Sequence, residues 1–334
     1  MSGTIMDTNH LPPSAAEPSA PEAASVEKIP PMGVDRTSVE RESTLSPLVD
    51  VFVGPHGIYP GVRWLIYLSI GYVLFRLFGD FMHALRSQYG GAIWWGLISQ
   101  GVFALAAILP AFVMARIENC PFSAFGLSPK KAFRRNFWAG TLWGIASLTV
   151  MMLVLRLAGA FEFGSLSLHG TRILKFAAYY AAFFLLTGFF EEFLMRGYSQ
   201  WVLSKGMHFW PTAALLSASF GALHFANPGE SKTGLIAAAL IGFFFCLTLR
   251  RTGDLWWAVG FHMSWDWGES YFYSVPNSGG MMTGHLLNSS FHGPDWLTGG
   301  SVGPEGSLLA FVVIVALWVA FDRTYPEVKY LPER

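Results

Sequence analysis

The stretch that decides the fold spans residues 176–196 and reads FAAYYAAFFLLTGFFEEFLMR. Its first fifteen residues are uncharged, and Glu191, Glu192 and Arg196 follow at its end. An apolar run of this kind is typical of a membrane helix, because a helix satisfies its backbone hydrogen bonds internally in lipid. The sequence therefore predicts a helix in the bilayer that carries ionisable groups, which are costly there and usually functional.

The composition of the whole chain agrees with a membrane protein. Of its 334 residues, 52% are hydrophobic and only 13% are charged, whereas soluble domains carry about 25% charged residues. The 22 basic and 22 acidic residues cancel, so no basic surface is expected for nucleic acid. The two cysteines form neither a disulfide scaffold nor a Cys-x-x-Cys zinc site. Membrane lipid is the expected surrounding partner.

Apolar segments divide the chain into a tail and a membrane body. Residues 1–60 are rich in Pro, Ser, Ala and Glu, and we expect a disordered cytoplasmic tail. Residues 61–330 form the predicted membrane domain, an all-α polytopic bundle of about eight transmembrane helices. The expected helices lie near 63–85, 91–115, 137–159, 173–203, 210–226, 233–250, 255–273 and 307–321.

The basic residues predict the orientation. Lys and Arg flank the segment ends on one side, whereas the Gly-rich loop 274–306 contains neither. By the positive-inside rule, the two termini are cytoplasmic and this loop is outside, as in a multi-pass protein of the bacterial inner (plasma) membrane. The basic and aromatic residues of 121–136 predict a helix in the cytoplasmic interface. Gly140 and Gly144 predict close helix packing inside the bundle.

Polar residues within the apolar segments are the candidate site. Arg76 and Asp80 lie four residues apart and are expected to neutralise each other. Glu192 and Arg196 have the same favourable spacing. Adjacent helical side chains point about 100° apart, which leaves Glu191 free to act as a general base. The alternative is that both glutamates pair with Arg196.

Two histidines and an aspartate complete the candidate set. His224 ends the apolar run 213–223, and His262 and Asp266 share one helical face. This second pair suits metal ligation or an oriented imidazole, or a structural hydrogen bond, and His224 could instead be a hydrogen-bonded packing residue. Counting along the helices puts these residues and Glu191 at similar depth, in a cavity that we expect to open to the cytoplasm.

The three motifs resemble a known family. Glu191-Glu192-Phe-Leu-Met-Arg196 looks like the Glu-Glu-x-x-x-Arg motif of the CPBP family, which includes CAAX proteases and bacteriocin-processing, Abi-like intramembrane proteins. Phe220-Gly-Ala-Leu-His224 is similar to its Phe-x-x-x-His motif, and His262-Met-Ser-Trp-Asp266 to its His-x-x-x-Asn/Asp motif. The motifs occur in the family's order, and the resemblance covers about residues 125–273.

The resemblance implies an intramembrane endopeptidase of the CAAX-protease type. Glu191 would activate water, and His224 and His262 would bind a metal or stabilise the oxyanion. Asp266 would stand beside His262, and Arg196 would fix Glu192. A Zn²⁺ ion, if bound, would be held by Glu191, His224, His262 and Asp266.

The partner implied by the resemblance is a peptide or protein substrate. Two other interpretations of the same residues stay open. One is a non-catalytic membrane scaffold or immunity protein of the same fold. The other is a transporter that uses the cluster to couple cations or protons.

Overall fold

The computed structural model describes residues 52–54, 57–89 and 93–332. The predicted tail, residues 1–60, lies outside this description up to residue 51. Its last residues contain a short antiparallel pair, β1 (Val53–Gly54) with β2 (Gly57–Ile58).

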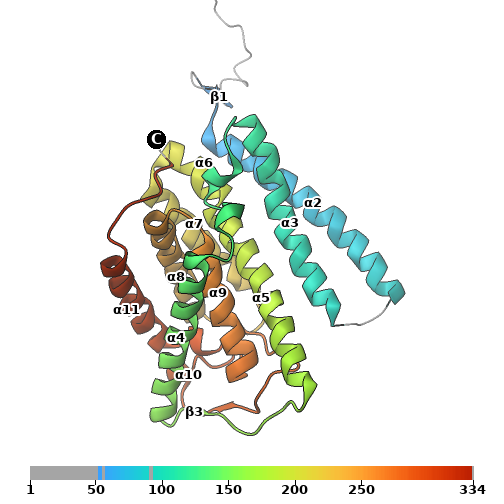
Figure 1. Cartoon of the computed structure of the whole chain (residues 1–334), viewed down its shortest axis with the longest axis vertical. Coiled ribbons are helices and arrows are strands. Elements are labelled where there is room, and N and C mark those ends of the chain that lie inside the picture. Colours follow the sequence, from blue (N-terminus) through green and yellow to red (C-terminus); the bar gives the residue numbers. More distant parts are fainter. Residues whose placement is uncertain (1–51, 55–56, 90–92, 333–334) are drawn as a thin grey trace, which may run out of the picture. The chain divides into compact units, whose positions relative to one another are not determined.

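Every predicted apolar segment forms a helix, so the all-α membrane architecture is confirmed (Figure 1). The fourth segment bends at Gly197 into two helices. The long helices are α2 (Pro60–Tyr89), α3 (Trp94–Ile117), α4 (Arg135–Leu157), α5 (Thr171–Arg196), α6 (Tyr198–Met207), α7 (Phe209–Leu223), α8 (Lys232–Thr252), α9 (Trp256–Trp267) and α11 (Leu308–Thr324).

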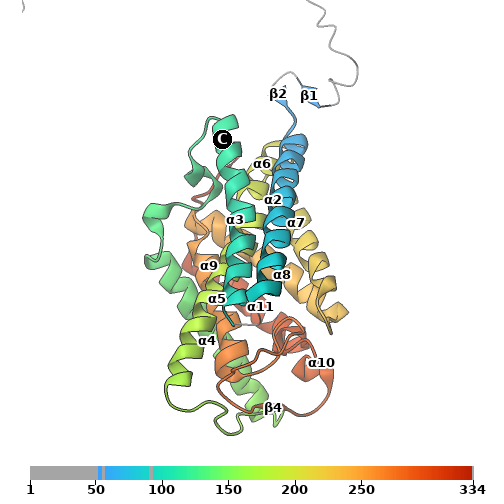
Figure 2. The same cartoon turned by 90° about the vertical axis from the view of Figure 1, so that its right-hand side faces the viewer.

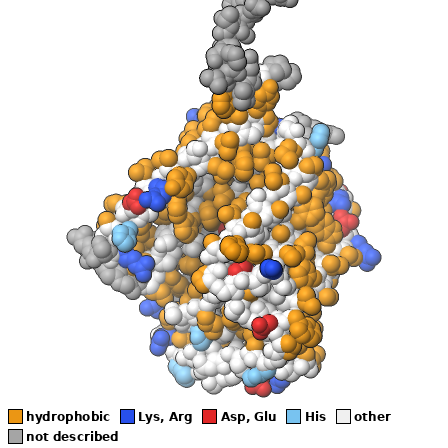
Figure 3. All heavy atoms as spheres, turned by 180° about the vertical axis from the view of Figure 1, so that it is seen from behind, with side chains coloured by type: hydrophobic (Ala, Val, Ile, Leu, Met, Phe, Trp, Pro, Cys, Tyr) orange, Lys and Arg blue, Asp and Glu red, His pale blue; other side chains and the backbone are white. Residues whose placement is uncertain are grey.

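Five segments of the described chain are long and apolar enough to cross a membrane: Pro60–Arg86, Trp94–Ile117, Arg135–Leu157, Thr171–Met207 and Lys232–Thr252. The other three predicted spans, in α7, α9 and α11, are shorter. The π-helix η4 (Gly268–Tyr273) extends α9 directly. Hydrophobic side chains cover much of the face seen in Figure 3. Leu65, Leu142 and Val312 are among the exposed hydrophobic residues of the protein, as expected for contact with lipid.

Helices α4 and α9 pack backbone against backbone at glycines. A methyl group added at Gly140 would lie 1.9 Å from the carbonyl oxygen of Trp257, and one added at Gly144 would lie 2.5 Å from that of Phe261. On the facing helix, a methyl at Gly260 would lie 2.2 Å from the carbonyl oxygen of Phe137. Gly140 and Gly144 therefore serve internal packing, as predicted.

The loops at the two ends of the bundle differ in structure. Residues 121–136 contain the short 3₁₀ turns η1 (Phe122–Phe125) and η2 (Pro129–Lys131). The predicted continuous interfacial helix is wrong, because Pro121, Pro129 and the left-handed Gly126 interrupt it. Asp254 anchors this segment through Asn136, at 2.8 Å, and through Lys131, at 3.3 Å.

The Gly-rich segment after α9 lies at the opposite end of the bundle (Figure 2). It contains β4 (Ser290–Phe291), which pairs with β3 (Phe161–Glu162), then α10 (Asp295–Thr298) and the 3₁₀ turn η5 (Pro304–Gly306). Ser307 then caps α11 by accepting a hydrogen bond from the Ala310 amide. This segment is therefore folded onto the bundle.

The close α4–α9 contact gives the first prediction. Gly140→Ala forces the two backbones apart, and we expect it to destabilise the protein by about 1–3 kcal/mol. The matched control is Gly101→Ala in α3, where an added methyl meets nothing within 4 Å and helix propensity favours alanine. Thermal unfolding in detergent measures both. Equal melting temperatures for the two variants would contradict the packing.

Candidate active site

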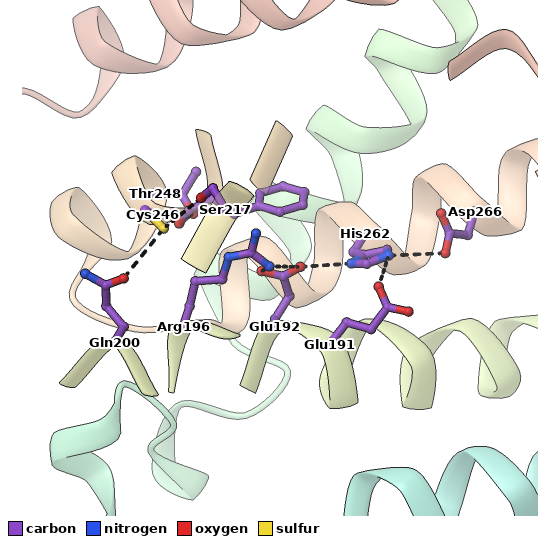
Figure 4. A network of polar contacts seen from close by, with 10 residues as sticks. Glu191, Glu192, Arg196, Gln200, Ser217, Cys246, Thr248, His262 and Asp266 are labelled. Atoms are coloured by element: carbon purple, nitrogen blue, oxygen red, sulfur yellow. Dashed lines mark hydrogen bonds and ion pairs between the residues drawn. The ribbon is translucent and has the colours of Figure 1, made fainter. Parts of the chain in front are cut away.

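The last two turns of α5 hold a fully buried ion pair. One guanidinium nitrogen of Arg196, Nη1, lies 3.3 Å from each carboxylate oxygen of Glu192, and neither side chain is exposed. The predicted pairing of these two residues is confirmed. The alternative, in which Glu191 also pairs with Arg196, is wrong, because Glu191 points towards α9 instead (Figure 4).

Three carboxylates surround the ring of His262. Its Nδ1 donates a hydrogen bond of 3.0 Å to Glu192, and its Nε2 lies 3.6 Å from Glu191 Oε2 and 3.4 Å from Asp266 Oδ2 (Figure 4). Because a carboxylate oxygen only accepts hydrogen bonds, the contact with Glu192 places a proton on Nδ1. Gly188 lets α5 approach α9 at this point, since a methyl there would lie 3.1 Å from His262 Cβ.

Aromatic rings enclose the other face of the arginine. The guanidinium carbon of Arg196 lies 4.6 Å from the ring centroid of Phe220 and 5.9 Å from that of Phe245, which stabilises the cation. A methyl group at Gly242 would lie 2.2 Å from Arg196 Nη2, so glycine is needed there. Phe245 and Gly242 were not predicted, because α8 carries no charged residue near them that would mark the site.

The second histidine lines a cavity next to the ion-pair network. His224 follows α7, and its Nδ1 donates to the Phe220 carbonyl oxygen over 2.8 Å. His224, His262 and Asp266 line one cavity of about 80 Å³ inside the bundle. The structure thus brings the predicted residues of all three motifs together.

The cavity faces the end of the bundle that carries segment 274–306. Its lining includes Glu230 of the α7–α8 loop and Ser278, Val302 and Glu305 of that segment. The cavity and segment 274–306 thus lie at the same end of the bundle. If this segment is outside, as predicted, the cavity cannot open to the cytoplasm. The physical reason is that α7 is short and ends at Leu223, which puts His224 beside this segment.

The metal prediction gains no support from the geometry. Among residues 52–54, 57–89 and 93–332, no group of three or more His, Cys, Asp or Glu side chains is arranged to hold a metal ion. Both ring nitrogens of His262 already face carboxylates. Zinc binding by Glu191, His224, His262 and Asp266 stays a prediction.

Comparison with known proteins gives one family. Residues 173–268 match the family model described as "Type II CAAX prenyl endopeptidase Rce1-like". This range extends from α5 to the end of α9 and contains all six predicted site residues, so the resemblance indicated by the motifs is confirmed over it. No curated protein and no solved structure matches the chain.

The buried ion pair gives the second prediction. Arg196→Met removes the guanidinium from the buried Glu192 and leaves His262 as its remaining partner, and we expect a loss of about 3–5 kcal/mol in stability. The matched control is Arg76→Met in α2. Arg76 lies 3.7 Å from Asp80 at the same spacing, and both side chains are exposed, so only a small effect is expected. Thermal unfolding in detergent compares them, and a similar small shift for both would show that the buried pair is not structurally important.

Proposed function

Since residues 173–268 match a family of CAAX prenyl endopeptidases, we propose that this chain is an intramembrane endopeptidase that hydrolyses a peptide bond with water activated by Glu191. The single observation that carries the proposal is the approach of Glu191 and Glu192, on α5, to one imidazole on α9 beside an internal cavity. Acid and imidazole at such distances are the groups that general acid–base catalysis requires.

The two glutamates take different roles in this proposal. Glu192 is fully buried and engaged by both Arg196 and His262, so it positions the imidazole and has no room for water. Glu191 is 26% exposed and has its ion-pair contact with His262 alone among the described residues. Its carboxylate is therefore the one able to take a proton from water.

The proposed reaction uses side chains of the chain itself. Glu191 removes a proton from water as the water oxygen attacks the peptide carbonyl carbon. With a proton on each ring nitrogen, His262 stabilises the negative charge that develops on the carbonyl oxygen, and Glu192 and Asp266 hold the ring in place. The proton held by Glu191 then passes to the departing amine nitrogen. His224 lines the same cavity and supplies a second polar contact to the substrate.

The membrane setting follows from the same proposal. We expect a multi-pass protein of the bacterial inner membrane with cytoplasmic termini, which the basic residues beside the helix ends support. The start of α2 and the end of the described chain lie at one end of the bundle (Figure 1). In this orientation, the catalytic cavity faces the non-cytoplasmic side.

The third prediction tests the proposed base. Glu191→Gln keeps the shape of the side chain but cannot accept a proton from water, so we expect cleavage to fall by about 10²–10⁴-fold. Membranes containing wild type or variant are incubated with a peptide library, and new peptide ends are counted by mass spectrometry. Glu162→Gln, at an exposed glutamate of β3, is the control and keeps wild-type activity.

Two outcomes would count against the proposal. Unchanged cleavage by Glu191→Gln would reject the role of this carboxylate. A complete lack of cleavage by wild type, with the protein folded, would favour a non-catalytic protein of the same fold.

A further inference from the structure

The catalytic cavity has an acidic wall that the proposed reaction does not use. Glu230 and Glu305 line it together with Asp266. None of the described residues around this cavity is a lysine or arginine. Apolar residues of α8 and α11 also line the cavity, among them Ala237, Ile241 and Ile314.

Both outer glutamates are held in place by backbone amides. The Ser278 amide donates to Glu305 Oε1, and the Ser231 amide donates to Glu230 Oε1 over 2.8 Å. The Glu230 carboxylate also lies against the first turn of α8, where a methyl at Gly234 would be 2.0 Å from its Oε1. Neither carboxylate forms an ion pair within the described residues.

A third carboxylate behind this wall lacks a counter-charge. Glu269 of η4 is completely buried, and neither of its oxygens makes a hydrogen bond of normal geometry within the described residues, although Trp265 lies close. An ionised acid buried without a partner is unfavourable, so a cation nearby would stabilise its charged form.

We propose that Glu230 and Glu305, beside Asp266, form a subsite that binds a lysine or arginine side chain of the substrate next to the scissile bond. This inference rests on the proposed endopeptidase function and names the class of peptide that it selects. The apolar lining from α8 and α11 suits the aliphatic stem of such a side chain, and the carboxylates receive its charged end.

Two observations favour a substrate side chain as the cation. The described residues offer no group arranged for a metal ion, and the acidic wall is continuous with His262 and His224 of the proposed catalytic site. Burial raises the pKa of Glu305 to about 7, and the charge of Asp266 adds to this shift. A cationic side chain in the cavity stabilises the ionised form of Glu305 and removes this cost.

The fourth prediction concerns substrate preference. Wild type in proteoliposomes digests a proteome-derived peptide library, and Lys or Arg should be enriched at one of the two positions beside the cleaved bond. The best peptide is then made with Lys, Gln or Glu at that position. We expect kcat/KM to be about 10–100-fold higher for Lys than for Gln, as a charge-assisted hydrogen bond provides.

Variants of the acidic wall test the assignment. Glu305→Gln should reduce the Lys-to-Gln ratio about 10-fold, and Glu305→Lys should reverse the preference towards Glu. Glu230→Gln gives the same loss of preference if the Glu305 variants do not fold, as judged by thermal unfolding. The control is Glu327→Gln, at an exposed residue near the chain end, which keeps the wild-type ratio.

The failure of the subsite and the failure of the proposed function give different results. Glu191-dependent cleavage without basic enrichment, or with ratios unchanged in the Glu305 and Glu230 variants, overturns the subsite and leaves the endopeptidase proposal standing. If wild type cleaves nothing in a Glu191-dependent manner, the proposed function fails and the subsite fails with it.

Discussion

The structure depends on a buried charge that cannot be left alone. Glu192 is completely buried in the bundle, and an isolated carboxylate there would be strongly destabilising. Arg196 and His262 supply its two partners, and Phe220 and Phe245 enclose the arginine. The need to neutralise the Glu192 carboxylate therefore fixes α5, α7, α8 and α9 relative to one another.

This constraint also determines what Glu191 can do. Arg196 and His262 Nδ1 both contact Glu192. The neighbouring carboxylate of Glu191 lies instead beside Nε2, on the other side of the same imidazole. Glycines make the arrangement possible: Gly188 admits His262 against α5, Gly242 admits the guanidinium, and Gly140 lets α4 support α9 from behind. The catalytic geometry that we propose is thus a consequence of helix packing.

Local rules explain what the sequence could predict. Glu192 with Arg196, and His262 with Asp266, are four residues apart on single helices, and a helix brings such pairs together wherever it lies. The position of His224 beside segment 274–306 depended instead on how that segment folds against the end of the bundle. Glu305 was out of reach because it lies in a segment shaped by turns at glycines such as Gly299 and Gly303, without helical or strand periodicity.

The central claim is that Glu191 and His262 act as one unit. A double-mutant cycle with Glu191→Gln, His262→Asn and the combined variant measures this directly through kcat/KM on one cleaved peptide. If Glu191 activates the water while His262 stabilises the same transition state, the double variant is no slower than the worse single variant. If the two losses multiply, the residues act independently, and a joint role for this carboxylate and this imidazole is contradicted.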